Sequence, residues 1–111
     1  MPANETEKTA PLPREPVRRS DRDLCLWDPL TDTYFPLDRR LRVLGKDPAC
    51  DGRLRHGTVS RRHARVEWTP EGPTLVDLGS SNGLWQDGRR VDRARLAAHR
   101  AVRLGATHLV V

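Results

Sequence analysis

The chain has 111 residues and a formal net charge of +5, a length that accommodates one domain with a modest core. No apolar run approaches the roughly 18 residues that a membrane-spanning helix needs, and no basic start followed by an apolar stretch marks a secretory signal. Cys25 and Cys50 have no metal-ligand spacing, so we expect free thiols in a reducing compartment. These features predict a cytoplasmic protein with no membrane segment, metal or cofactor.

The first part of the chain differs in composition from the rest. Residues 1–21 contain prolines at positions 2, 11, 13 and 16, no aromatic residue, and polar residues nearly throughout. Such a segment cannot bury enough apolar surface to offset the entropy lost on ordering. We therefore expect a flexible N-terminal tail over residues 1–21 and a single folded domain over residues 22–111.

From residue 23 onward, short stretches of alternating apolar and polar residues are separated by turn residues, a pattern typical of strands. The expected strands are 23–27, 33–37, 41–44, 51–55 (weakly), 64–68, 74–78, 84–86, 89–91, 101–104 and 107–111. Asp87-Gly88 favours a two-residue hairpin turn. Residues 91–100 look like a loop or a single helical turn. Many short strands with regular turns predict an all-β sandwich.

Positive charge is concentrated in the middle of the chain. Residues 38–66 contain nine Lys or Arg against three acidic residues, a local net charge of +6. This excess predicts an anionic partner, which could be a phosphopeptide or a nucleic acid. Three tryptophans, Trp27, Trp68 and Trp85, could stack on bases. Because Trp27 and Trp68 fall in expected strands, we expect them in the core, and nucleic-acid binding is the less favoured alternative.

Two short segments rich in small hydrogen-bonding residues stand beside expected strands: VSRRHA at Val59–Ala64 and DLGSSNG at Asp77–Gly83. Gly45-Lys46 ends an earlier strand, Ser60 follows Lys46 by 14 residues, and Asn82 follows Ser60 by 22. In order and spacing these segments resemble the forkhead-associated (FHA) domain, and the resemblance covers about Leu24 to Val111. It implies a β-sandwich of about eleven short strands whose apical loops bind phosphothreonine.

The resemblance also implies a set of ligand-binding residues. Ser60 donates its hydroxyl to the phosphate, Arg61 supplies a planar cationic fork, and Ser81 adds a second hydroxyl or its backbone N–H. Asn82 binds the main chain of the ligand, because its amide offers both a donor and an acceptor. Lys46 stands where the family usually has arginine, so it keeps the positive charge and loses bidentate geometry.

A second group of residues is expected to support these loops rather than to contact the ligand. In the family the histidine at position 63 is mainly a buried strut that ties the two binding loops together. Gly79 and Gly83 allow tight turns of positive φ. The loop-supporting residues are Gly45, His63, Asp77, Gly79, Ser80 and Gly83.

Two patterns suggest an enzyme at first reading. Gly79-Ser80-Ser81-Asn82-Gly83 matches G-x-S-x-G, which in hydrolases needs a strand before it and a helix after it in a much larger domain. Ser60, His63 and Asp77 could form a triad, but no oxyanion-hole element or substrate cleft is indicated. We therefore expect recognition without catalysis.

The expected partners are proteins carrying phosphothreonine, substrates of a Ser/Thr kinase in a bacterium, as the strong preference for arginine over lysine suggests. Arg53, Arg55 and His56 predict a preference for an acidic residue in the ligand. Thr6 and Thr9 lie in an acidic stretch, so a phosphorylated tail could fold back into the chain's own pocket. Because Lys46 departs from the family, a scaffold that binds proteins independently of phosphate remains the alternative.

Overall fold

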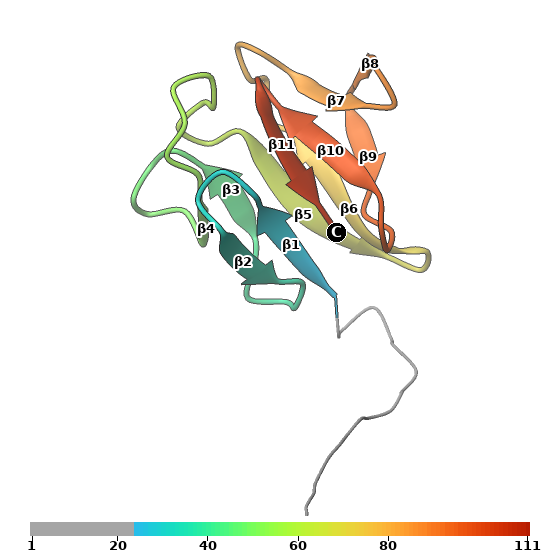
Figure 1. Ribbon diagram of the computed structural model, residues 1–111. Coiled ribbons are helices and arrows are strands. Elements are labelled where there is room, and N and C mark those ends of the chain that lie inside the picture. The colour runs from blue at the N-terminus through green and yellow to red at the C-terminus, as the bar shows by residue number, and fades with distance from the viewer. Residues whose placement is uncertain (1–23) are drawn as a thin grey trace, which may run out of the picture.

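The structure is a computed structural model that describes residues 24–111. Thr6, Thr9 and the expected boundary between residues 21 and 22 lie outside this range. The described residues form eleven strands in two sheets, which confirms the predicted all-β sandwich (Figure 1). They contain no helix, and hence none that could cross a membrane.

The first sheet has six strands in the order β2-β1-β11-β10-β7-β8. Its neighbouring strands pair antiparallel, and the short hairpins β1–β2, β7–β8 and β10–β11 supply most of the pairs. The strands are β1 (Cys25–Asp28), β2 (Thr33–Pro36), β7 (Leu84–Gln86), β8 (Arg89–Val91), β10 (Ala101–Leu104) and β11 (Thr107–Val110).

The second sheet has five strands in the order β4-β3-β5-β6-β9. Its centre is the long hairpin β5–β6, in which Ala64 pairs with Asp77. At one edge, β4 runs parallel to β3. The strands are β3 (Val43–Gly45), β4 (Gly52–Arg53), β5 (Ala64–Thr69), β6 (Gly72–Asp77) and β9 (Arg93–Arg95).

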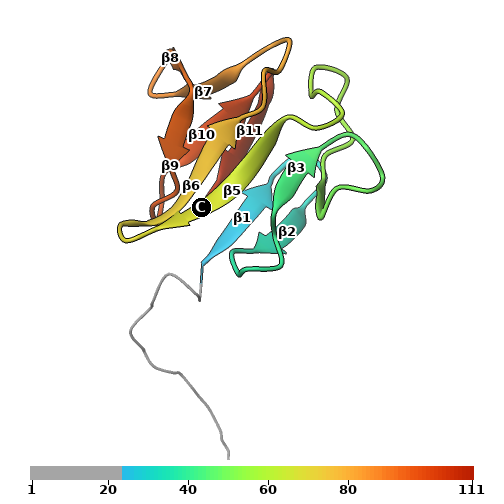
Figure 2. The same ribbon diagram turned by 180° about the vertical axis from the view of Figure 1, so that it is seen from behind.

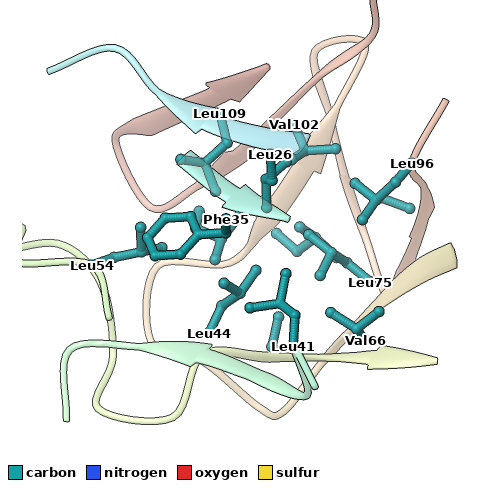
Figure 3. Packing of buried hydrophobic residues seen from close by; sticks show 14 of the residues in the cluster. Leu26, Phe35, Leu41, Leu44, Leu54, Val66, Leu75, Leu96, Val102 and Leu109 are labelled. Carbon is teal, nitrogen blue, oxygen red and sulfur yellow. The ribbon is translucent and has the colours of Figure 1, made fainter. Parts of the chain in front are cut away.

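A leucine-rich core fills the space between the sheets (Figure 3). Alternation of side chains along each strand sends one set inward, so Leu26 of β1, Leu44 of β3 and Leu75 of β6 are fully buried. Leu54, Val59 and Leu96 extend the core beneath the loops. Because the loops rest on buried side chains, they have a fixed base from which polar residues project.

Two expectations are wrong. Residues 91–100 contain the strand β9, in which Ala94 is buried opposite Leu75 of β6. The flanking arginines obscured this strand, because a single small apolar residue between two charges gives almost no periodic signal. Trp27 is not a core residue: it is partly exposed and stacks on Tyr34 with ring centroids 5.9 Å apart. Its neighbour Leu26 takes the inward position, so Trp27 faces away from the core.

The loops after β4 and β6 project from one end of the sandwich (Figures 1 and 2). Both views place the start of β1 and the C-terminal residue toward the opposite end. The expected ligand-binding segments therefore lie at the same end of the fold, although they are about 20 residues apart in sequence.

Candidate functional site

The first loop of the site is held against the end of β3 by backbone hydrogen bonds. The amides of Lys46 and Asp47 donate to the carbonyls of Ser60 and Arg61, each at 3.0 Å. Gly45 permits this approach, since a Cβ atom there would lie 2.0 Å from the Arg61 carbonyl oxygen. The lysine at position 46 and the Ser60-Arg61 pair are thereby fixed side by side.

The second loop is folded around the carboxylate of Asp77. One carboxylate oxygen accepts hydrogen bonds from the amides of Gly79 and Ser80, and the other accepts the Ser80 hydroxyl at 2.6 Å. The Ser80 oxygen in turn accepts the amide of Gly83 at 3.0 Å. Gly79 and Gly83 have φ values of 74° and 87°. Residues with a Cβ atom rarely adopt such positive φ values. Asp77 thus fixes the shape of this loop and presents Ser81 at its tip.

His63 connects the two loops from inside the protein. Its side chain is fully buried; Nδ1 accepts the Ser60 amide at 3.0 Å, and Nε2 lies 2.8 Å from the Gly83 carbonyl oxygen. Because the Ser60 amide can only donate, Nδ1 carries no proton and Nε2–H donates to Gly83. Burial lowers the pKa of His63 below its ordinary value of 6.5, although the bond to Gly83 opposes this shift. The hydrogen bonds and the lowered pKa therefore both favour a neutral His63 imidazole in the folded protein.

Five polar side chains at the surface of these loops form what we call the donor cluster: Lys46, Arg61, Ser81 and Asn82, which are exposed, and Ser60, which is half-buried. The amide of Ser81 donates to the Ser60 hydroxyl oxygen at 3.2 Å, so the loops also meet at the surface. The Ser60 hydroxyl proton has no acceptor among residues 24–111 and remains available to a ligand. Within the same residues, no carboxylate lies within 4.0 Å of the Lys46 or Arg61 cation.

Two residues that sequence reasoning missed complete the support of the cluster. The Thr58 carbonyl accepts the Asn82 side-chain amide at 2.9 Å, and the Thr58 hydroxyl accepts the amide of Ala106 at 2.8 Å. The Arg90 guanidinium donates to the Ser80 carbonyl at 3.2 Å. The β7–β8 hairpin has a register in which Arg90 pairs with Trp85. This register, which follows from the turn, was the sequence signal that could have placed Arg90 near the second loop. Thr58 belongs to none of the sequence motifs, so no sequence signal identified it. Its contact with Asn82 is visible only in the folded structure.

His56, which the sequence groups with Arg53 and Arg55, is engaged within the protein. Its Nε2 lies 2.6 Å from a carboxylate oxygen of Asp28, a residue that is only 1% exposed. Burial raises the pKa of Asp28, but hydrogen bonds from His56 and Thr31 outweigh burial and hold this pKa below its ordinary value. His56 thus anchors the loop after β4 to the end of β1, and only Arg53 and Arg55 of the predicted basic group are exposed.

The arrangement is unsuited to nucleophilic catalysis by a triad. A general base must be within hydrogen-bond reach of the nucleophile, but both ring nitrogens of His63 are bonded to backbone groups. The Asp77 carboxylate is occupied by its own loop. The donor cluster contributes two cations, two hydroxyls and an amide from neighbouring loops, and groups of these kinds are suited to binding an anion such as a phosphate.

Comparison with known proteins identifies the family of the chain. The FHA domain family matches residues 42–105. The glycogen accumulation regulator GarA of Mycobacterium tuberculosis is 37% identical to this chain over 82 residues, which cover 74% of the chain and 51% of GarA. The chain therefore spans about half the length of the curated relatives that it matches first.

Solved structures give the same result. An FHA domain from a structural and functional analysis of phosphothreonine-dependent FHA domain interactions superposes with a TM-score of 0.69 and 28% identity, covering 78% of this chain and 91% of that one. Mycobacterium tuberculosis EmbR, in complex with a low affinity phosphopeptide, gives a TM-score of 0.68 and 25% identity, covering 78% of this chain and 23% of EmbR. From its sequence match and its fold, the chain belongs to the FHA domain family of protein-interaction modules.

Proposed function

We propose that this chain is a phosphothreonine-dependent binding module that acts as an adaptor downstream of a Ser/Thr kinase. The observation that carries the proposal is the donor cluster, in which hydrogen bonds hold the backbone of Lys46 against Ser60 and the Ser81 amide against the Ser60 hydroxyl, and in which neither the Lys46 nor the Arg61 cation has an acidic partner within residues 24–111. Phosphate binds most strongly to charged donors that are already in place. The similar FHA domain from the study of phosphothreonine-dependent interactions and the similar EmbR complex with a phosphopeptide support the proposal.

Each member of the cluster has a distinct part in this proposal. Lys46 and Arg61 neutralise the phosphate, and the Ser60 hydroxyl donates to one phosphate oxygen. Ser81 lies at the meeting point of the two loops and offers a second hydroxyl. Asn82 already donates one amide hydrogen to Thr58, which leaves its oxygen and its second hydrogen for the ligand main chain. The partners are phosphothreonine-containing proteins of the cytoplasm, and binding involves no catalytic step.

The proposal extends to the N-terminal tail. Phosphorylation of Thr6 or Thr9 would create an intramolecular ligand for the donor cluster. Residues 1–23 lie outside the described part of the structure, so this extension rests on the acidic sequence around the two threonines. NMR shifts in the Ser60 and Ser81 loops on tail phosphorylation would support it, and unchanged spectra would refute it.

The proposal is tested by titrating the protein with a phosphothreonine peptide library, alongside phosphoserine and unphosphorylated libraries at physiological salt. Arg61→Gln removes one cation from the cluster, and Arg62→Gln is a matched control because Arg62 is an exposed neighbour of the same charge. We expect binding that requires phosphothreonine, falls at least about tenfold in Arg61→Gln, and is nearly unchanged in Arg62→Gln. Equal binding of phosphorylated and unphosphorylated libraries would instead indicate a phosphate-independent scaffold.

A further inference from the structure

A depression outside the donor cluster lies where the edges of the two sheets meet. The strand β2 forms one edge of the first sheet and β4 forms one edge of the second. Between them is a groove of about 510 Å³, which we call the edge groove; it is lined by Thr31, Thr33, Phe35, Asp51, Arg53 and Arg55. No residue of the donor cluster contributes to its lining.

The arginines supply the groove's available hydrogen-bond donors. Arg53 and Arg55 are exposed, and neither guanidinium lies within 4.0 Å of a carboxylate among residues 24–111. The Thr31 hydroxyl donates to the buried Asp28 carboxylate at 3.0 Å and lies 2.8 Å from the hydroxyl of Thr33. The threonine protons are thereby used within the protein, whereas both cations can receive an anion.

The acidic residue in the groove, Asp51, does not neutralise these arginines directly. One of its carboxylate oxygens accepts the backbone amides of Arg42 and Val43, at 3.2 and 3.1 Å. These bonds tie Asp51 to the start of β3 and direct its charge toward the backbone rather than toward Arg53 or Arg55. The groove contains two arginines and one aspartate, so its net charge is positive. A positive groove favours an acidic ligand.

Two hydrogen bonds connect the edge groove to the donor cluster. The Arg53 Nε donates to the Lys46 carbonyl at 3.3 Å, and the Lys46 amide donates to the Ser60 carbonyl at 3.0 Å. A guanidinium has five N–H donors, so the bond to Lys46 leaves most of the Arg53 donors for a ligand. Arg53 of the edge groove is therefore in direct contact with the backbone of Lys46 in the donor cluster.

Arg55 is also held in place. The next residue, His56, is bound to the buried carboxylate of Asp28 at 2.6 Å, which joins the loop after β4 to the first sheet. A loop that is ordered before binding loses less entropy when its side chains contact a ligand. The Asp28–His56 bond thus gives the arginine beside it a fixed backbone position.

We propose that the edge groove binds carboxylate side chains of the same phosphopeptide whose phosphothreonine occupies the donor cluster. This inference rests on the proposed function and names the ligand class: a peptide with acidic residues a few positions from the phosphothreonine. An extended peptide advances about 3.3 Å per residue, so such residues can reach from one site to the other. Arg53 and Arg55 are the specificity-determining residues.

The experiment uses three phosphothreonine peptides in an otherwise neutral sequence, with three glutamates before the phosphothreonine, three after it, or none. We expect one of the two acidic peptides to bind about five to ten times more tightly than the neutral peptide, the gain of a few partly exposed charge-assisted bonds. The measured quantity is the affinity ratio, which is the dissociation constant of the neutral peptide divided by that of the tighter acidic peptide. This ratio does not depend on the concentration of active protein.

Two double variants then locate the effect. Arg53→Gln with Arg55→Gln removes both cations of the groove, and we expect the affinity ratio to fall to about one. Arg89→Gln with Arg95→Gln is the matched control; it removes the same charge from exposed positions on β8 and β9. The control should keep most of the ratio. Thermal unfolding of each variant establishes that it is folded.

The outcomes separate this inference from the proposed function. If neutral phosphopeptide binds but glutamates add nothing, the edge groove is not a carboxylate site. The same conclusion follows if both double variants lower the ratio equally, because attraction by overall charge would then explain it. If the neutral phosphopeptide itself fails to bind the unmodified protein, the proposed function is wrong, and the groove inference falls with it.

Discussion

The Nε2 of His63 and the carbonyl oxygen of Gly83 lie 2.8 Å apart inside the protein, across 20 residues of sequence. This bond joins the two loops of the donor cluster from below, while the bond from the Ser81 amide to the Ser60 hydroxyl joins them at the surface. The relative position of the two loops of the donor cluster therefore depends on a side chain that is fully buried.

Replacing His63 with alanine should lower the free energy of unfolding by about 3 kcal/mol, because it leaves a cavity and deprives the Ser60 amide of its acceptor. Urea denaturation measures this change. His108→Ala is the control, since His108 is exposed on β11 and its loss should have little effect. A similar small change in both variants would show that His63 is not a strut.

Stability should decrease as the pH falls below about 6.5. Burial lowers the pKa of His63 in the folded protein, so the unfolded chain takes up a proton first and unfolding becomes more favourable through that pH window. The test is urea denaturation between pH 7.5 and 5 for the unmodified protein and for His63→Gln. The difference in unfolding free energy between them should shrink on acidification. A constant difference would contradict the depressed pKa.

Lys46→Arg should tighten phosphothreonine binding by about two- to fivefold, because a guanidinium can bind two phosphate oxygens at once whereas an ammonium acts as a point charge. Calorimetric titration with one phosphothreonine peptide measures the effect. Lys46→Gln should weaken binding of the same peptide. An unchanged or weaker affinity in Lys46→Arg would show that the pocket is adapted to lysine.

Gly45→Ala should destabilise the fold by about 2 kcal/mol or more, because the new Cβ would meet the Arg61 carbonyl oxygen at 2.0 Å. The same strain should weaken phosphopeptide binding, since it pushes the Ser60-Arg61 segment away from Lys46. Gly57→Ala is a well matched control: it makes the same chemical change in the loop after β4, with no atom within 4 Å. Equal stability of the two variants would mean that the backbone there adjusts freely.

Much of the fold could be predicted from local patterns. The hairpins around Asp87-Gly88 and Gly105-Ala106 follow from turn residues between alternating stretches, and the structure places strands on both sides of each. The prediction failed at β9, where Ala94 alone marks the buried face. It failed also at Trp27, because alternation shows that neighbours face opposite ways and does not show which face is inside.

The sequence by itself determined the sandwich class, the family and the residues of the donor cluster, since strand alternation, turn residues and motif spacing are short-range properties of the chain. Only the tertiary structure decided which polar groups are engaged. Asp28 meets His56 across 28 residues, and the groove beside Arg53 and Arg55 forms between β2 of one sheet and β4 of the other. These contacts depend on how separate sheet edges are brought together, which no local pattern encodes. They turn His56 into an anchor and leave Arg53 and Arg55 facing the groove.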